Sequence, residues 1–299
     1  VTNWIVEQHL DLPAAARLLG LDGEDVSSKL RVLELDDQGQ SLGARAFQID
    51  RASMAGHFVV TWRMPGPTPA GTTRRFLIAL DGEGQAPGHD EPINATRDGE
   101  KITIKNGPVV LEHAMDAGGM ISRVDVGATG GAIKWNDRIW GNWYWKGRRE
   151  FHLADHKAES MKIVAAGPLR VVVETRSDYL NDGDAPNSHP RATYRFTTHA
   201  GQPVTRVEAL ATQNFQKFWF HFRRTEMDLA RASVNGTVRD ESAGNWAAAF
   251  SNDLLIGIAD GSTPTVEGGP MLASAANTQW RTLDQAWQAT LFWGAGKKE

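Results

Sequence analysis

Residues 138–156, RIWGNWYWKGRREFHLADH, combine side-chain types that suit the binding of an acidic sugar. Sugar rings present flat apolar C–H faces that stack on aromatic side chains, and an arginine binds a carboxylate through two parallel hydrogen bonds. We therefore expect Trp140, Trp143 and Trp145 to serve as sugar platforms, and Arg148 and Arg149 to hold the carboxylate of a uronate. The alternative is that the tryptophans fill a core and the arginines are solvated.

His152 and His156 stand four residues apart in the same stretch. On a helical turn, which the segment FHLADHKAE weakly suggests, this spacing places both imidazoles on one face, as in a metal site. No glutamate completes a zinc signature such as H-E-x-x-H, so we expect no metal there. Because histidine titrates near neutral pH, His152 is a candidate for proton transfer or substrate contact, and a polar surface pair is the alternative.

The segment SHPRATYRF adds a second group of candidates after a long polar loop. In a strand, successive side chains point to opposite faces, so His189 and Arg191 share one face and Tyr194 lies on the other. Loops at the ends of sandwich strands often carry sites, which favours this segment as a second part of the site.

The segment KFWFHFRR is the third candidate. Trp219, His221 and Arg223 alternate onto one face of an expected strand, while three phenylalanines take the other face. The phenylalanines are the natural core side, which leaves a row of Trp, His and Arg for a glycan-contacting surface. The alternative is that another sheet or a loop covers this row.

Composition excludes several classes of protein. There is no cysteine, so disulfides, thiol catalysis and cysteine-ligated metals are excluded, and the net charge of −4 lacks the basic excess of a nucleic-acid binder. Apolar runs are only as long as strands, so no membrane partner is expected. The chain begins with Val1 rather than Met, and we expect an exported protein, periplasmic or secreted, whose leader was removed. No cofactor is expected, although calcium is possible at Asp178, Asp182 and Asp184, whose loop lacks EF-hand spacing.

The elements that must position these residues are almost all strands. One helix is predicted in DLPAAARLLG, with Asp11 as N-cap and Gly20 as its end. Elsewhere, long alternating segments separated by Gly, Asn and Asp turns predict antiparallel sheets. Residues 81–100 are rich in Gly, Pro and acidic side chains without periodicity, which predicts a domain boundary. We therefore predict an all-β protein with a small β-domain at 1–90 and a large antiparallel β-sandwich at 91–299 that carries the site.

Two segments carry a resemblance to known families. The first, LDLPAAARLLGLDGEDVSSKLRVLELDDQGQ with PAGTTRRFLIAL, resembles the small β-domain that precedes catalytic domains in many bacterial carbohydrate-active proteins. The second, ITIKNGPVVLEHAMDAGGMISRVDVGATGG, resembles the opening of the β-supersandwich domains of rhamnogalacturonan-type polysaccharide lyases and galactose-mutarotase-like proteins. The resemblance implies a broad concave sheet face for a glycan chain. The catalytic histidine motif of a mutarotase is not evident, so lyase or hydrolase action is expected before epimerisation.

A polysaccharide lyase acting by β-elimination must neutralise a uronate carboxylate, remove the C5 proton and protonate the leaving oxygen. The catalytic candidates for this reaction are Tyr144, His152, His189, Tyr194 and His221. The substrate-binding candidates are Trp140, Trp143, Trp145, Arg148, Arg149, Arg191, Trp219 and Arg223. A glycoside hydrolase would instead use two carboxylates, for which Asp137, Glu150 and Asp155 flank the first stretch. A glycan-binding module without catalysis is the third hypothesis.

Overall fold

A computed structural model describes residues 2–21, 26–52, 57–81, 92–135, 138–141, 149–180, 191–211, 217–224, 246–251, 254–259, 277–282 and 286–295. Within these ranges the chain forms antiparallel sheets and a single α-helix, so the all-β prediction is confirmed. The chain divides into a small unit (residues 1–93, 165–170 and 199–201) and a large unit (residues 94–164, 171–198 and 202–299). The predicted boundary between residues 90 and 91 lies outside the described residues.

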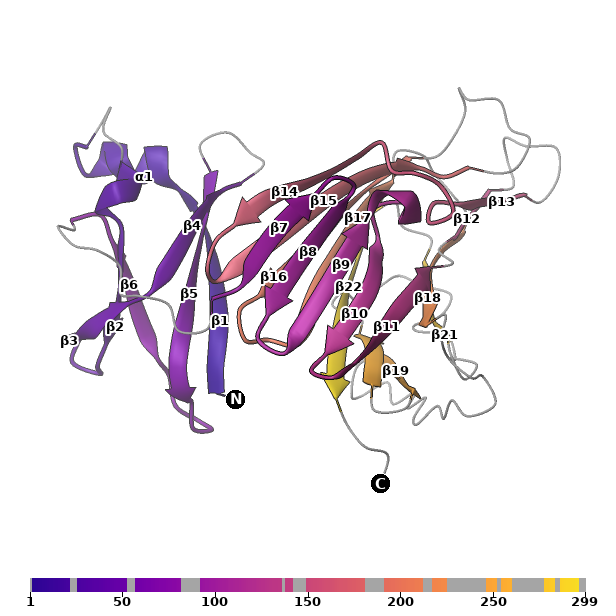
Figure 1. Cartoon of the computed structure of the whole chain (residues 1–299). Coiled ribbons are helices and arrows are strands. Elements are labelled where there is room, and N and C mark those ends of the chain that lie inside the picture. Colours follow the sequence, from indigo (N-terminus) through magenta and orange to yellow (C-terminus); the bar gives the residue numbers. More distant parts are fainter. Residues whose placement is uncertain are drawn as a thin grey trace. The chain divides into compact units, whose positions relative to one another are not determined.

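The small unit contains two sheets of three described strands each (Figure 1). One sheet has the order β1 (Thr2–Asp11), β5 (His57–Pro67) and β4 (Phe47–Arg51), and the other has the order β3 (Ser41–Arg45), β2 (Arg31–Leu35) and β6 (Arg75–Ala79). Buried side chains from both sheets form its core, with the rings of Trp62 and Phe76 at 5.6 Å. A short 3-10 helix, η1 (Val26–Lys29), precedes β2.

The predicted helix is confirmed as α1 (Leu12–Leu18). The Asp11 carboxylate caps its first turn by accepting a hydrogen bond from Ala14 N at 3.0 Å, and proline stands in that turn, where no backbone donor is needed. The helix ends at Leu18 and is followed by Gly20 at φ +70°, a left-handed conformation that glycine adopts without strain. Leu12 and Ala16 face the core of the small unit.

A nearly buried carboxylate, Glu34 on β2, joins the strands of this unit through two arginines. The Arg74 guanidinium donates to both oxygens of Glu34 at 2.7 and 2.8 Å, and Arg45 donates to the second oxygen at 2.8 Å. The hydrogen bonds from Arg74 lower the pKa of Glu34, with those of Arg45 adding to the effect against the opposing influence of burial. Glu34 therefore remains ionised in the interior because it is paired.

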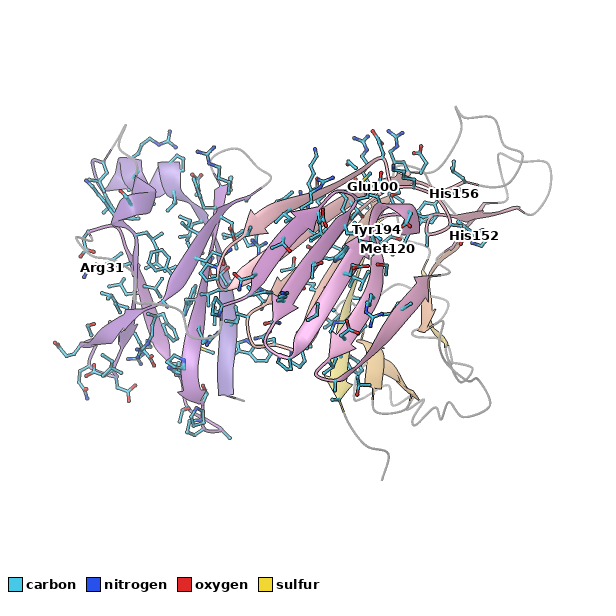
Figure 2. All side chains as sticks on the ribbon, viewed as in Figure 1. Arg31, Glu100, Met120, His152, His156 and Tyr194 are labelled. Carbon is cyan, nitrogen blue, oxygen red and sulfur yellow. The ribbon has the colours of Figure 1, made fainter. Side chains whose placement is uncertain are left out.

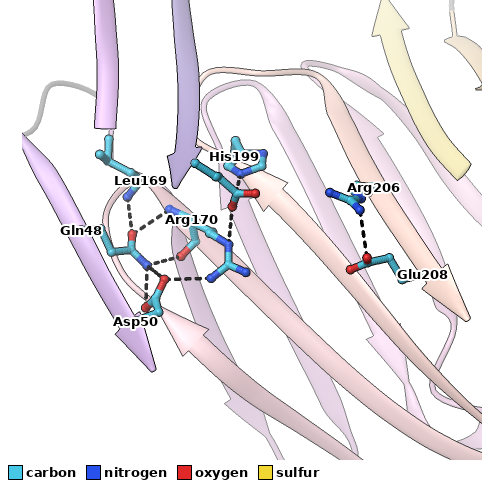
Figure 3. Close-up of polar contacts among 8 residues, drawn as sticks. Gln48, Asp50, Leu169, Arg170, His199, Arg206 and Glu208 are labelled. Atoms are coloured by element: carbon cyan, nitrogen blue, oxygen red, sulfur yellow. Dashed lines mark hydrogen bonds and ion pairs between the residues drawn. The ribbon is translucent and has the colours of Figure 1, made fainter. Parts of the chain in front are cut away.

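Two turns, 165–170 and 199–201, belong to the small unit although their neighbours in sequence belong to the large one. Gln48 on β4 accepts hydrogen bonds from the backbone N–H groups of Leu169 and Arg170, at 2.9 and 2.8 Å, and donates to the Arg170 carbonyl at 2.9 Å (Figure 3). The Arg170 side chain then bridges Glu7 on β1 and Asp50 on β4, at 2.6 and 2.9 Å. A network of charge-assisted hydrogen bonds thus holds one of these turns against the small unit's own strands.

The large unit contains two sheets (Figure 1). Among the described strands, the nine-stranded sheet has the order β13 (Arg149–His152), β12 (Arg138–Gly141), β18 (Lys217–Arg224), β11 (Thr129–Trp135), β10 (Ile121–Val126), β9 (Val109–Ala114), β8 (Lys101–Asn106) and β7 (Asn94–Asp98), with β21 (Asn277–Thr282) paired to β18. The seven-stranded sheet has the order β14 (Ser160–Ala166), β15 (Arg170–Asp178), β16 (Arg191–His199), β17 (Val204–Ala211), β22 (Ala286–Ala295), β20 (Leu254–Ala259) and β19 (Trp246–Ser251). The 3-10 turn η2 (Met115–Ala117) follows β9.

The two sheets of the large unit bury their inner faces against each other. The His113 ring on β9 packs edge-on against Phe196 on β16, with centroids 4.7 Å apart. Gly119 has φ +77°, and a Cβ there would come within 2.7 Å of the Thr175 Cβ on β15, so glycine fits this close approach. The predicted sandwich is therefore two packed antiparallel sheets, as the alternation along β8, β9 and β10 indicated.

No α-helix in the described ranges has the length and hydrophobicity needed to cross a lipid bilayer.

Candidate functional site

Four short strands bring the candidate segments together at one end of the nine-stranded sheet (Figure 1). β12 pairs with β13 on one side and with β18 on the other, and β21 pairs with the opposite edge of β18. The stretch around residue 140 and the segment KFWFHFRR, far apart in the sequence, are thus direct neighbours. The segment SHPRATYRF, by contrast, contributes β16 to the other sheet.

The pairing register assigns residues to the two faces of this end. Residues directly opposite one another in an antiparallel pair lie on the same face of the sheet. Arg138 is opposite both His152 and Trp219, and Trp219 is opposite Arg281. Trp140 is opposite Glu150 and Lys217. We call the set that shares this face the aromatic–basic face: Lys134, Arg138, Trp140, Glu150, His152, Lys217, Trp219, His221, Arg223, Asn277, Gln279 and Arg281.

The opposite face is the core side. Ile133 on β11 is opposite Arg224 and is only 5% exposed. By alternation, residue 133 shares its face with the three phenylalanines of β18, and β12 contributes Ile139 opposite Phe218. The aromatic–basic face is therefore the outer face of the nine-stranded sheet. It continues toward β10 and β9 with Arg123, Asp125 and Glu112, which lie on the solvent side.

Several predicted residues lie on the aromatic–basic face. They are Trp140, His152, Trp219, His221 and Arg223. Arg149 is on β13 opposite Gly141, which places it on the other face of the same sheet. Trp143, Tyr144, Trp145 and Arg148, all in 142–148, and His189 in 181–190, lie outside the described residues.

Tyr194 and Arg191 belong to the other sheet, on β16. Tyr194 is fully buried, and its hydroxyl oxygen lies 2.6 Å from that of Tyr179. Arg191 is partly exposed and donates to Asp178 at 2.6 Å, which raises the pKa of Arg191. Burial among core side chains does not suit Tyr194 for contact with a polysaccharide, and the partner of Arg191 is already a carboxylate of the protein. Neither placement supports the role predicted for these residues.

His152 is the last residue of strand β13 and does not lie in a helix. The weak prediction of a helix at 151–159 is wrong, because residues 149–152 form β13 and a turn follows. Backbone hydrogen bonds of 2.9 Å run in both directions between His152 and Leu180, at the end of β15. Figure 2 shows His152 and His156 at the same end of the large unit. The pair therefore lacks the helical spacing that a shared metal would use.

Sequence reasoning missed four cations of the aromatic–basic face, Lys134, Arg138, Lys217 and Arg281, of which the two arginines lie directly opposite Trp219. Arg138 opens the quoted stretch and Arg281 lies in the segment TQWRT, and neither stands out by composition. Only the pairing of β12 and β21 with β18 places both beside Trp219. The alternation within β18 could not have identified them, because their place on this face depends on which strands pair with β18 and in which register.

The described residues offer no metal site. No group of three His, Asp or Glu side chains in the described ranges is placed to hold a metal ion. Of the possible calcium ligands, Asp178 is engaged by Arg191, while Asp182 and Asp184 lie outside the described residues.

These features define an all-β protein in which a small two-sheet β-unit precedes a large two-sheet sandwich with an outer aromatic–basic face. No protein-family model and no curated protein matches the sequence. Among solved structures, the fold is similar to a protein in glycosyl hydrolase family 38 from Enterococcus faecalis, with a TM-score of 0.60 and 9% identity, and to an alpha-mannosidase from Enterococcus faecalis V583, with 0.56 and 11%. The match covers 98% of this chain in both cases, but 43% and 41% of those chains. At such identities the similarity shows the fold alone.

Proposed function

We propose that the protein acts on carbohydrates and binds an acidic, uronate-containing glycan on the aromatic–basic face. The observation that carries this proposal is the register that sets Trp140 and Trp219 on one outer face with Arg138, Lys217 and Arg281. Aromatic platforms between cations match the apolar ring faces and the carboxylates of such a chain. The fold similarity to two carbohydrate-processing enzymes supports the same class. A periplasmic or secreted location, where such chains are encountered, is part of the proposal.

Glycoside hydrolysis is the reaction that we place first. It requires carboxylates near the glycosidic bond, and Glu150 lies on the aromatic–basic face opposite Trp140. Asp155, exposed in the turn after β13, is a second carboxylate in the same stretch of the sequence. Two solved structures with a similar fold are described as a glycosyl hydrolase family 38 protein and an alpha-mannosidase, which favours hydrolysis over elimination.

β-Elimination is the second candidate. His152 and His221 share the aromatic–basic face and supply a base, and Arg223 or Arg138 supplies charge neutralisation. Of the three tyrosines, Tyr179 and Tyr194 are fully buried, so the proton donor of a lyase would be Tyr144. The lyase reaction that the sequence favoured would thus have to proceed without Tyr194, which was one of its expected catalytic residues.

One set of measurements tests the proposal. Purified protein is titrated with polygalacturonate and with neutral mannan by affinity electrophoresis, and each incubation is followed by absorbance of unsaturated uronates and by reducing ends. Binding of polygalacturonate is expected, and Trp219→Ala is expected to weaken it at least tenfold (about 1.5 kcal/mol or more for a lost aromatic platform). Trp4→Ala, which removes a 51% exposed tryptophan of the small unit, is the matched control and should bind normally.

The products then decide the reaction. New reducing ends without absorbance indicate a hydrolase, a rise in absorbance indicates a lyase, and retention without either product indicates a binding module. If no glycan binds, or if Trp219→Ala binds as well as the wild type, the assignment of the aromatic–basic face to carbohydrate is incorrect.

A further inference from the structure

We infer that Arg138, Trp219 and Arg281 form one row on the aromatic–basic face that selects a sugar bearing a negative charge, either a carboxylate or a sulfate ester. The inference rests on the proposed function and deepens it by naming the residues that bind the charged group of the sugar. Arg138 stands directly opposite Trp219 across the β12–β18 pair, and Trp219 stands directly opposite Arg281 across the β18–β21 pair. The three positions therefore cross three neighbouring strands in a line.

The spacing of the row fits a single charged sugar ring. Neighbouring strands lie about 4.8 Å apart, so the two arginine positions are about 10 Å apart with the tryptophan midway between them. A ring over the tryptophan position has an arginine position on either side. The guanidinium fork of arginine binds anions through two hydrogen bonds, so two arginine positions beside a tryptophan position suit a sugar ring that carries a carboxylate or a sulfate.

The same arrangement repeats one step along the strands. Trp140 is directly opposite Lys217, and Trp140 and Trp219 are diagonal neighbours across the β12–β18 pair, about 7–8 Å apart. Across the β12–β18 pair, each tryptophan is therefore opposite a cation: Trp219 is opposite Arg138, and Trp140 is opposite Lys217. This pattern suits a chain in which more than one consecutive sugar is charged.

The charge of this end differs from that of the rest of the outer face. Further along the sheet, two of the cations form ion pairs with carboxylates: Lys101 pairs with Glu112 at 2.9 Å, and Arg123 pairs with Asp125 at 2.8 Å. At the β12–β18–β21 end, the described positions of the aromatic–basic face contain five Lys or Arg residues and a single carboxylate residue, Glu150. Glu150 is in the row of Trp140, not in that of Trp219. Among the described positions, Lys and Arg thus outnumber carboxylates where the anion is proposed to bind.

Binding of defined oligosaccharides to charge-removing variants tests the inference. Wild type, Arg138→Gln, Arg281→Gln and the control Arg123→Gln, whose arginine lies on the same outer face but pairs with Asp125, are titrated with oligogalacturonate, its methyl ester and a sulfated dextran oligosaccharide by calorimetry. Each row variant should lose about tenfold in affinity for the charged probe, the size of one charge-assisted hydrogen-bonded contact. Affinity for the uncharged ester should not change, and Arg123→Gln should bind like wild type.

Two further variants separate the possible outcomes. Arg138→Lys keeps the charge and should retain binding better than Arg138→Gln, and thermal unfolding of each variant checks that the fold is intact. Preference for oligogalacturonate identifies the anion as a carboxylate, and preference for the dextran sulfate identifies it as a sulfate ester. If the row variants bind charged and esterified probes as wild type does while Trp219→Ala loses both, the inference is wrong and the proposed function stands. If Trp219→Ala also changes nothing, the proposed function itself fails.

Discussion

The hydroxyl oxygens of Tyr179 and Tyr194 lie 2.6 Å apart in the interior of the large unit, where both side chains are fully buried. Tyr179 directly follows β15 and Tyr194 lies in β16, so the pair joins neighbouring strands of the seven-stranded sheet. The Tyr194 ring also stacks on Phe196, with centroids 6.0 Å apart. A buried phenol pair of this kind stabilises a core because one hydroxyl donates a hydrogen bond that the other accepts.

Replacing Tyr194 by Phe should therefore affect stability and not glycan binding. The variant keeps the ring and removes the shared hydrogen bond, so the free energy of unfolding should fall by about 1 kcal/mol. Urea denaturation measures this loss, and the double variant with Tyr179→Phe should cost less than the sum of the single changes. A loss of glycan affinity with unchanged stability would instead restore Tyr194 as a site residue.

His113 should make the protein less stable in mild acid. Its Nδ1 lies 3.0 Å from the Gly119 carbonyl, and since a carbonyl only accepts, the proton is on Nδ1. Burial lowers the pKa of His113 to about 4 from 6.5. Below pH 6.5 the unfolded chain binds a proton that the folded one does not, so stability falls as the pH decreases from 6.5 to 4, by up to about 3 kcal/mol.

The measurement is the free energy of unfolding in urea at pH 7 and pH 5. Wild type should lose more stability between these values than His113→Gln, which cannot titrate. The matched control, His9→Gln, changes an exposed histidine of β1 and should keep the wild-type difference. Equal pH dependence in wild type and His113→Gln would contradict the prediction.

Gln48→Glu should loosen the turn at 165–170. The new carboxylate cannot donate to the Arg170 carbonyl, and it replaces an amide that donates to Asp50 at 2.8 Å. We expect the free energy of unfolding to fall by about 2 kcal/mol, from one lost donor and two neighbouring negative charges. Hydrogen exchange of the Leu169 and Arg170 amides should become faster. Gln38→Glu, in the exposed turn after β2, is the control, and an equal effect there would refute a specific role for Gln48.

Glu34→Gln tests the buried ion pair of the small unit. Removing the charge leaves Arg74 and Arg45 without their carboxylate, and we expect a loss of about 2 kcal/mol at pH 7. Because the folded pKa of Glu34 is lowered, its contribution is present above the ordinary pKa and is lost as the pH falls through the folded value. The stability gap between wild type and variant should therefore shrink in acid.

An exposed ion pair supplies the comparison for Glu34. Arg206 and Glu208 pair at 2.9 Å with 48% and 44% of their side chains exposed (Figure 3). Because solvent screens such a pair, Glu208→Gln should cost well under about 1 kcal/mol. Similar losses for the two variants, measured by urea denaturation, would show that burial does not strengthen the Glu34 pairs.

Much of the fold could be predicted from the sequence because its signals are local. The Asn106-Gly107 turn between β8 and β9, the cap of α1 and the alternation in β18 each depend on a few consecutive residues. Alternation also separated Arg191 from Tyr194 correctly, since Arg191 is partly exposed and Tyr194 is buried. It could not show that the second sheet covers Tyr194, because burial depends on a partner distant in sequence.

The candidate site was only partly predictable for the same reason. Trp219 and His221 followed from the pattern within one strand, whereas Arg138 and Arg281 became candidates only through pairing with β18. The register between distant strands is not encoded in local periodicity. Arg149 is the opposite case. Its neighbours in the sequence made it a site candidate, but its register position opposite Gly141 places it on the other face of the sheet.

The two turns that belong to the small unit have a consequence for protein engineering. Residues 1–93 include Glu7, Gln48 and Asp50 but not Arg170 and His199, to which their side chains bind. A gene fragment cut after residue 93 would encode an incomplete module, with carboxylates and an amide that have lost their native partners. Transplanting this module onto another protein would require carrying both turns along, so recombination at a single point could not exchange it intact.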